Sequence, residues 1–308
     1  MTEPIKEIIP RDIPQNIIST LNLFADTLEE FVNFGSHILA WDDNPITKGE
    51  ENIAPTMLFR HFLDLIDSIS VLARKSCGDP AKLLIRGALE TMLGIEYLFE
   101  KDTYDRALAF LVIDTTNQIK ILKKLNAKTQ EGKKLNKIIK DESIMGEFRL
   151  SSELDLDDEV VRKESVLKQP KFQRAMNEYD QLKLKNEKNP KWYRLFDGPR
   201  SIEELAIRLK RRSFYELLYR KWSGPVHGSD IFLGRLLQNE EKGVDIVQLR
   251  FVKDLQEVVK FSMILSLVVF KAFIENRLPD KKPIMGQWYL SIRETFFNIL
   301  QNNLIVVK

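Results

Sequence analysis

The chain has 308 residues, of which 44% are hydrophobic and 30% are charged, proportions that exclude a disordered protein. Only 13 glycines and 12 prolines are present, which excludes a β-sandwich or barrel with many tight turns and favours long helices. The 47 lysines and arginines nearly balance the 45 acidic residues, so net charge implies no partner, and the single cysteine excludes an internal disulfide framework.

The N-terminal segment, residues 1–55, is expected to form one helix and a polar loop. Acids and prolines stand at the very N-terminus, where a secretion signal would need an apolar stretch, and this predicts a cytoplasmic protein. Apolar residues then recur at helical spacing, which predicts an amphipathic helix over 16–40.

A helical core is expected from residues 56–125 and 197–308. Its first part contains apolar helices over 56–76, 81–100 and 103–125, with Gly78 closing the first and Asp79-Pro80 opening the second. The helix over 81–100 is apolar on nearly every side, which places it at the centre of the domain.

Residues 126–196 are expected to form a peripheral insertion that is rich in lysine and mixed in charge. Between positions 120 and 140 the only acid is Glu131, and a charge run of this kind is usually a solvated face. Contact with a nucleic acid is the alternative interpretation of these lysines. They are Lys120, Lys123, Lys124, Lys128, Lys133, Lys134, Lys137 and Lys140.

The second part of the core begins with a capping box formed by Ser201 and Glu204. The pattern predicts a helix over 201–222, ended by Gly224-Pro225, a short helix over 231–238, a long helix over 247–277 and a last helix from 287. The longest apolar run, 261–270, is too short to span a membrane. The expected fold is therefore an all-α, multi-helix bundle with a central apolar helix and a peripheral charged insertion.

Arg86 and Glu90 are one turn apart in the most apolar helix, where each needs a partner. They either pair with each other or hold a third group in a polar pocket. His61 and Asp64 share a face of the preceding helix, but a chain with three histidines lacks the ligands of a structural zinc site. No metal and no cofactor is expected.

The segment from Arg220 to His227 combines a permanent cation with a group that exchanges protons near neutral pH. The imidazole would take the proton of a ribose 2′-hydroxyl that attacks the adjacent phosphate, and the guanidinium would stabilise the developing charge. Ser223 and Ser229 would add hydrogen bonds to a phosphate. The structural alternative is a junction histidine that donates to backbone carbonyls, with Arg220 capping the same helix end.

A basic face next to this segment would favour an RNA backbone. The residues expected to contribute to RNA binding are Arg208, Arg211, Arg212 and Lys221.

The segment resembles the R-x(4–6)-H motif of the HEPN superfamily, small helical domains found in prokaryotic toxins and defence ribonucleases. The sequences R-G-A-L-E at 86–90 and Y-R-K-W-S-G-P-V-H-G-S at 219–229 are also similar to features of an uncharacterised bacterial helical domain family. The resemblance covers roughly half the chain. It implies a homodimer in which two motifs meet, with Arg220 and His227 catalytic and Arg86 or Glu90 orienting them.

The expected function is that of a metal-independent endoribonuclease of HEPN type, a toxin or anti-phage defence effector. Its partners would be a second copy of the chain, RNA and a regulatory or defence protein, with no membrane. The alternatives are a non-catalytic helical module that binds a protein partner or nucleotide, and a structural scaffold in a defence assembly.

Overall fold

The computed structural model of the chain describes residues 9, 11–42, 49–142, 156–224, 236–238 and 243–305. These residues divide into two compact units, the first from residues up to 47, 55–101 and 202 onward, and the second from 48–54 and 102–201. Both units are built from helices, so the predicted all-α, multi-helix fold is confirmed. No helix in the described ranges has the length and hydropathy that a membrane span requires.

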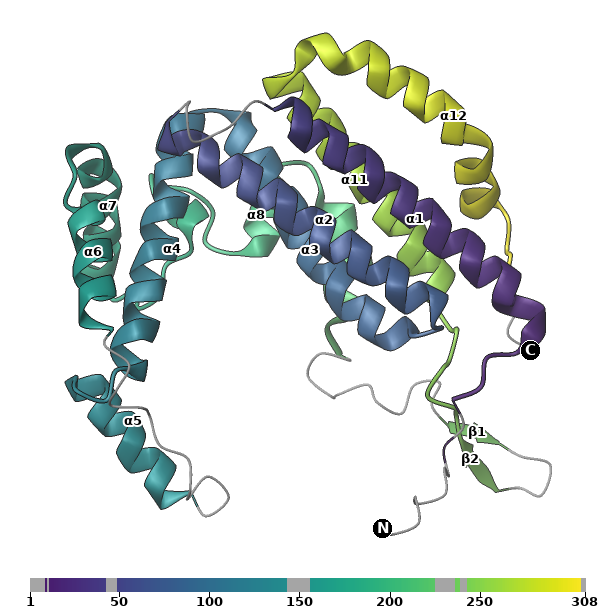
Figure 1. The fold of residues 1–308 in the computed structure, drawn as a ribbon, viewed down its shortest axis with the longest axis horizontal. Helices are drawn as coiled ribbons and strands as arrows, with labels where there is room; N and C mark the ends of the chain where they lie inside the picture. The colour runs from purple at the N-terminus through teal and green to yellow at the C-terminus, as the bar shows by residue number, and fades with distance from the viewer. Residues whose placement is uncertain are drawn as a thin grey trace. The chain divides into compact units, whose positions relative to one another are not determined.

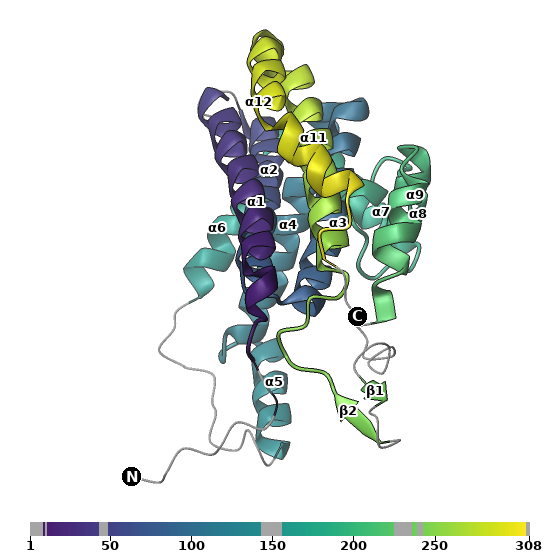
Figure 2. The same cartoon turned by 90° about the vertical axis from the view of Figure 1, so that its right-hand side faces the viewer.

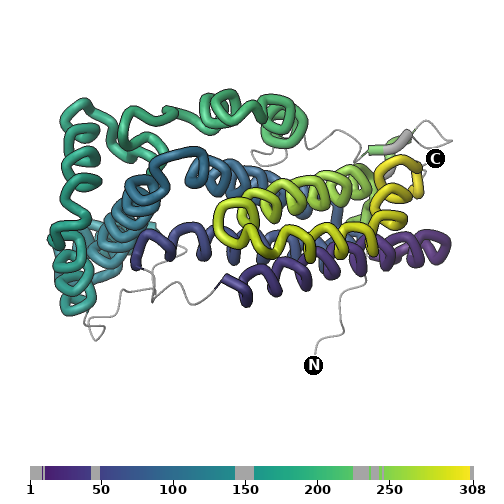
Figure 3. Tube along the Cα trace, turned by 90° about the horizontal axis from the view of Figure 1, so that it is seen from above, coloured from purple at the N-terminus to yellow at the C-terminus, as the bar shows by residue number. Residues whose placement is uncertain are grey.

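Long helices make up most of the first unit (Figures 1 and 2). The long helix α11 packs against α1, α3 and α12, and seen from above it runs beside α1 and α12 (Figure 3). The bounds are α1 (Gln15–Trp41), α2 (Ile53–Arg74), α3 (Gly78–Glu100), α11 (Leu255–Arg277), the short η7 (Pro279–Lys281) and α12 (Lys282–Gln301).

Aromatic rings fill the core of the first unit. Phe59 of α2 lies 4.5 Å from Phe273 of α11 between ring centres, and Phe34 of α1 stacks on Trp288 of α12 at 4.0 Å. Each ring removes a large apolar surface from water, which is the main contribution to the stability of the bundle. The predicted central helix corresponds to α3, in which Ile85, Ala88, Leu89, Met92, Leu93, Ile95 and Leu98 are buried.

A buried ion pair joins the ends of three helices in this unit. The carboxylate of Asp42 accepts a bond of 2.7 Å from Nη2 of Arg277, and the two side chains are 1% and 10% exposed. Thr56 of α2 donates a further bond of 3.3 Å to Asp42. The pair therefore fixes the C-terminus of α1 to the C-terminus of α11 and the first turns of α2.

The helix predicted over 201–222 is interrupted in the structure. It consists of α8 (Ile202–Arg208), α9 (Arg212–Phe214) and η6 (Tyr215–Arg220), a segment of π-helix. Lys210 has a left-handed φ of 59°. The amide of Arg211 donates to the carbonyl of Ala206 and that of Lys210 to the carbonyl of Ile207, the pattern of a Schellman cap, so α8 must end there.

The prediction of a short helix over 231–238 is wrong for residues 236–238, the part of that range that the structure describes. Leu236–Gln238 forms strand β1, which pairs antiparallel with β2 (Val244–Ile246), Leu236 standing opposite Ile246. The strand partner lies after an intervening segment, and β-branched Val244 and Ile246 favour an extended chain. Helix α11 begins at Leu255 instead of at 247, directly after Asp254, which has a φ of 61°.

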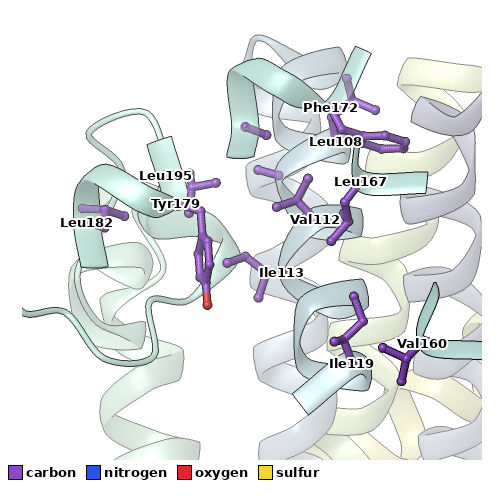
Figure 4. Close-up of a cluster of buried hydrophobic side chains, with 12 residues drawn as sticks. Leu108, Val112, Ile113, Ile119, Val160, Leu167, Phe172, Tyr179, Leu182 and Leu195 are labelled. Carbon is purple, nitrogen blue, oxygen red and sulfur yellow. The ribbon is translucent and has the colours of Figure 1, made fainter. Parts of the chain in front are cut away.

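The second unit is organised on α4. Its buried residues Leu108, Val112 and Ile119 pack against apolar side chains of the following helices, as Figure 4 shows. The second compact unit contains residues 48–54 and 102–201, and α4 supplies its core face. The elements are η2 (Glu50–Asn52), α4 (Thr103–Leu125), α5 (Gln130–Asp141), α6 (Asp157–Leu167), η4 (Pro170–Phe172), α7 (Gln173–Leu184) and η5 (Trp192–Arg194).

Candidate functional site

The first half of the Arg220–His227 segment lies on η6 and the turn after it. Leu218 and Trp222, four residues apart, are buried, and the Trp222 ring meets Phe261 of α11 edge to face at 6.3 Å. This spacing anchors one side of the segment and leaves Arg220 and Lys221 on the exposed side. The π-helical turn widens the backbone here, a feature frequent at functional sites.

Arg86 reaches the same segment from α3. Its guanidinium carbon lies 4.2 Å from the centre of the Tyr219 ring, and Tyr219 in turn stacks on Tyr215 at 5.3 Å. Arg86 is only 9% exposed, and its Nε has no hydrogen-bond partner among the described residues. A buried guanidinium N–H without an acceptor carries a desolvation cost, which a bound anion would remove.

The expected pairing of Arg86 with Glu90 is absent among the described residues. Glu90 is exposed, one turn after Arg86 on the same face of α3. Tyr219 covers Arg86, and farther along this face Arg208 covers Tyr97, its guanidinium carbon 5.1 Å from the ring centre. Glu90 lies between these two contacts, so its carboxylate is open to solvent.

Arg220 is close to a carboxylate of its own helix. Its Nη1 lies 3.4 Å from Oε2 of Glu216, and the Arg220 side chain is 69% exposed. A pair this exposed is weakly held, so the guanidinium is free to engage a ligand. Arg220 directly follows Tyr219, the residue whose ring Arg86 contacts.

The remaining motif residues are only partly within the described chain. Ser223 is half-buried at the end of the described segment. His227 and Ser229, a catalytic and a supporting residue in the prediction, lie outside the described residues.

The cations expected to bind RNA serve largely as ion-pair partners within the first unit. Nε of Arg208 donates to both carboxylate oxygens of Glu100, at 3.0 and 3.1 Å. Arg211 donates to Glu96 through Nε at 3.0 Å and through Nη2 at 2.7 Å. The hydrogen bond to Glu96 raises the pKa of Arg211. Both pairs tie the α8–α9 segment to α3.

The other two expected RNA-binding residues are paired to different degrees. Nζ of Lys221 is 2.7 Å from both carboxylate oxygens of Glu257 on α11, whereas Arg212 is 68% exposed and 3.8 Å from Glu216. The basic face of the sequence is thus mostly neutralised by acids from distant positions.

Tyr219 is the residue of this site that the sequence interpretation missed. Its signal is the pair of tyrosines at 215 and 219, four residues apart on one helical face beside the motif. Burial raises the pKa of Tyr215, with the nearby Glu203 carboxylate as the second cause. Tyr215 therefore stays neutral, and the Tyr219 ring stacked on it presents a face to Arg86.

The histidine and aspartate of α2 do not assemble a metal site in the described chain. Asp64 forms an ion pair with Arg60, and no group of three His, Cys, Asp or Glu side chains suited to a metal occurs in the parts that the structure describes.

The fold and this site define a helical-bundle protein with a buried arginine set against a cationic helix turn. Residues 52–244 match the model of a family of unknown function, DUF5677, and the chain belongs to that family. The matched range contains both Arg86 and the Arg220–His227 segment. No curated protein and no solved structure matches the chain.

Proposed function

We propose that the protein is an HEPN-like, metal-independent endoribonuclease, a toxin or anti-phage effector, with its active site at Arg220 and His227. The observation that carries this proposal is the contact of Arg86 with Tyr219, next to Arg220. Arg220 directly follows Tyr219 in the chain, and the Nε of the buried Arg86 lacks an acceptor among the described residues. A phosphodiester is an anion whose oxygens fit such donors.

The proposed reaction is an internal transesterification. His227 takes the proton of a ribose 2′-hydroxyl, and the 2′-oxygen forms a bond to the adjacent phosphorus. The bond from phosphorus to the 5′-oxygen of the next nucleotide breaks, and that oxygen receives a proton from the imidazolium. The products carry a 2′,3′-cyclic phosphate and a 5′-hydroxyl.

The two arginines have distinct roles in this proposal. Arg220, exposed and weakly paired, contacts the phosphoryl oxygens and stabilises the charge that develops on them. Arg86 is a positioning residue that acts through its contact with the ring of Tyr219, the residue before Arg220. Glu90, open to solvent on the same face of α3, orients His227, while Ser223 and Ser229 donate hydrogen bonds to phosphate oxygens.

The resemblance to HEPN ribonucleases adds that two copies of the chain bring their motifs together. A regulatory or defence protein would then control access to the composite site.

The test is cleavage of total RNA in EDTA by the wild type, by Arg220→Ala and by His227→Ala. Arg162→Ala is the matched control, because it removes an equally exposed arginine that pairs with a glutamate of its own helix and lies outside the proposed site. Loss of cleavage in the first two variants alone, with circular dichroism unchanged, supports the proposal. RNA or nucleotide binding without cleavage in the wild type favours the non-catalytic module, and equal loss in Arg162→Ala refutes the assignment of Arg220.

A further inference from the structure

Helix α5 (Gln130–Asp141) of the second unit carries four exposed lysines that make no ion pair with a described residue. Lys133, Lys137 and Lys140 fall on one side of the helix at intervals of four and three residues, and Lys134 flanks them. The span from 133 to 140 is about 10 Å at the rise of an α-helix. These four residues are called the lysine face of α5.

The lysine face differs from the arginine-rich segment of the first unit because its positive charges are not paired with described carboxylates. Arg208, Arg211 and Lys221 are held by carboxylates at 3 Å or less. On α5 the helix supplies only Glu131 and Asp141 as acids, and neither makes an ion pair with a described lysine. Uncompensated positive charge in the described chain is therefore dense on α5 and sparse beside the motif.

The apolar side of α5 is directed to α4, the helix that α5 contacts in the second unit. Ile139 is 7% exposed and Leu135 is half-buried, so this side is used for packing. Ile138 at the margin is 54% exposed. The lysines on the opposite side consequently point outward to solvent.

The start of α5 is firmly anchored. Thr129 caps the helix by accepting from the amide of Gly132 at 3.0 Å, and the Thr129 hydroxyl donates to the carbonyl of Asn126 at 2.9 Å. Asn126, 1% exposed, also donates to Asp157 of α6 at 2.7 Å. A Cβ at Gly132 would lie 1.9 Å from the Asn126 carbonyl oxygen, so only glycine fits here. The lysines therefore stand on a fixed scaffold.

We propose that the lysine face of α5 binds the phosphate backbone of a nucleic acid. Regularly placed, uncompensated ammonium groups complement a linear polyanion and release its counterions. Lysine is a point charge without a fork for base edges, so RNA and DNA strands bind alike and without sequence preference. An anionic membrane fits less well, because an interfacial helix needs the apolar side that α5 uses against α4.

The proposal concerns the second unit and stands whether or not the motif of the first unit cleaves RNA. It is tested by fluorescence anisotropy with a labelled oligo(dT), which lacks the 2′-hydroxyl and cannot be cleaved by the proposed reaction, and with oligo(U) beside it. The variant is the triple substitution Lys133→Gln, Lys137→Gln and Lys140→Gln in the full chain. Its matched control is Lys185→Gln, Lys188→Gln and Lys191→Gln, which removes the same charge from exposed lysines of the same unit.

The α5 triple variant is expected to bind both oligonucleotides about tenfold or more weakly at low salt, and to lower the salt slope of log K by about 2. The control triple variant should stay near the wild type. Equal loss in the two variants, no binding by the wild type, or binding to phosphatidylserine vesicles but not to oligonucleotides would each overturn the proposal. Unchanged helicity in circular dichroism ensures that the comparison is between folded proteins.

Discussion

The guanidinium carbon of Arg86 and the ring centre of Tyr219 lie 4.2 Å apart, although 133 positions separate the residues in the sequence. The contact brings a buried cation of the most apolar helix to the residue before Arg220. A ring face offers the cation partial electrostatic compensation, and the buried Nε of Arg86 has no acceptor among the described residues. This arrangement is suited to holding an anion beside the motif.

Replacement of Arg86 separates packing from anion binding. Arg86→Lys keeps the charge but loses the planar fork, and we expect RNA cleavage to fall more than tenfold with a loss of about 1 kcal/mol in the free energy of unfolding. Urea denaturation and a cleavage assay provide the two measurements. Arg86→Met, which retains the bulk and removes the charge, should be at least as inactive. Full cleavage by either variant would exclude Arg86 from the site.

Arg211 is expected to matter for stability and little for nucleic-acid affinity. Its two bonds to Glu96 are partly buried, so Arg211→Ala should lower the free energy of unfolding by about 1–2 kcal/mol. Oligonucleotide affinity should stay unchanged, because the charge removed is already compensated. A double-mutant cycle with Glu96→Gln measures the coupling of the pair. A large loss of affinity would show that Arg211 contacts the ligand after all.

The sequence was sufficient for the long helices and insufficient for the partners of the charged residues. The helix predicted over 103–125 has the same bounds as α4, because helical periodicity and a polar break define it locally. Glu96 and Glu100 lie 115 and 108 positions from the arginines they bind, and no local pattern reveals such pairing. The segment before the motif therefore carries less unpaired positive charge than its own sequence suggests, because the acids of α3 pair with its arginines.

The interruptions of regular structure were missed for a related reason. A left-handed φ at Lys210 is unusual for a residue with a Cβ, and the cap that requires it is defined by backbone bonds instead of residue type. Strand β1 depends on a partner several residues later in the chain. The exposure of Glu90 likewise depends on where two other segments cover α3.

The Asp42–Arg277 pair is expected to dominate the stability of the first unit among its ion pairs. Asp42→Asn removes the charge of Asp42 from a buried guanidinium, and a loss of about 3–5 kcal/mol in the free energy of unfolding should follow. Guanidinium chloride titration measures it. Asp26→Asn, on the exposed pair with Arg74, is the control and should change little. Comparable effects of the two substitutions would contradict the burial argument.

The contact of Lys171 with Glu50 predicts a dependence of stability on pH. The hydrogen bond from Lys171 lowers the pKa of Glu50. Both residues belong to the second unit, so this bond connects the segment 48–54 to the rest of that unit. Because the folded pKa is depressed, the stabilisation is present above the ordinary pKa of glutamate and is lost as pH falls through the folded value. Lys171→Gln should therefore be less stable than the wild type at neutral pH and equal to it in acid. A difference that persists below the folded pKa would contradict this linkage.

The chemistry of the RNA ends tests the central claim most directly. Wild-type protein incubated with RNA in EDTA should produce 2′,3′-cyclic phosphate and 5′-hydroxyl ends, identified by mass spectrometry, and His227→Ala should produce none. A strand with a single 2′-deoxy substitution should resist cleavage at that position, because the attacking oxygen is missing. Products with 5′-phosphate ends, or the same products from His227→Ala, would contradict the assignment of His227 and Arg220 as the catalytic pair.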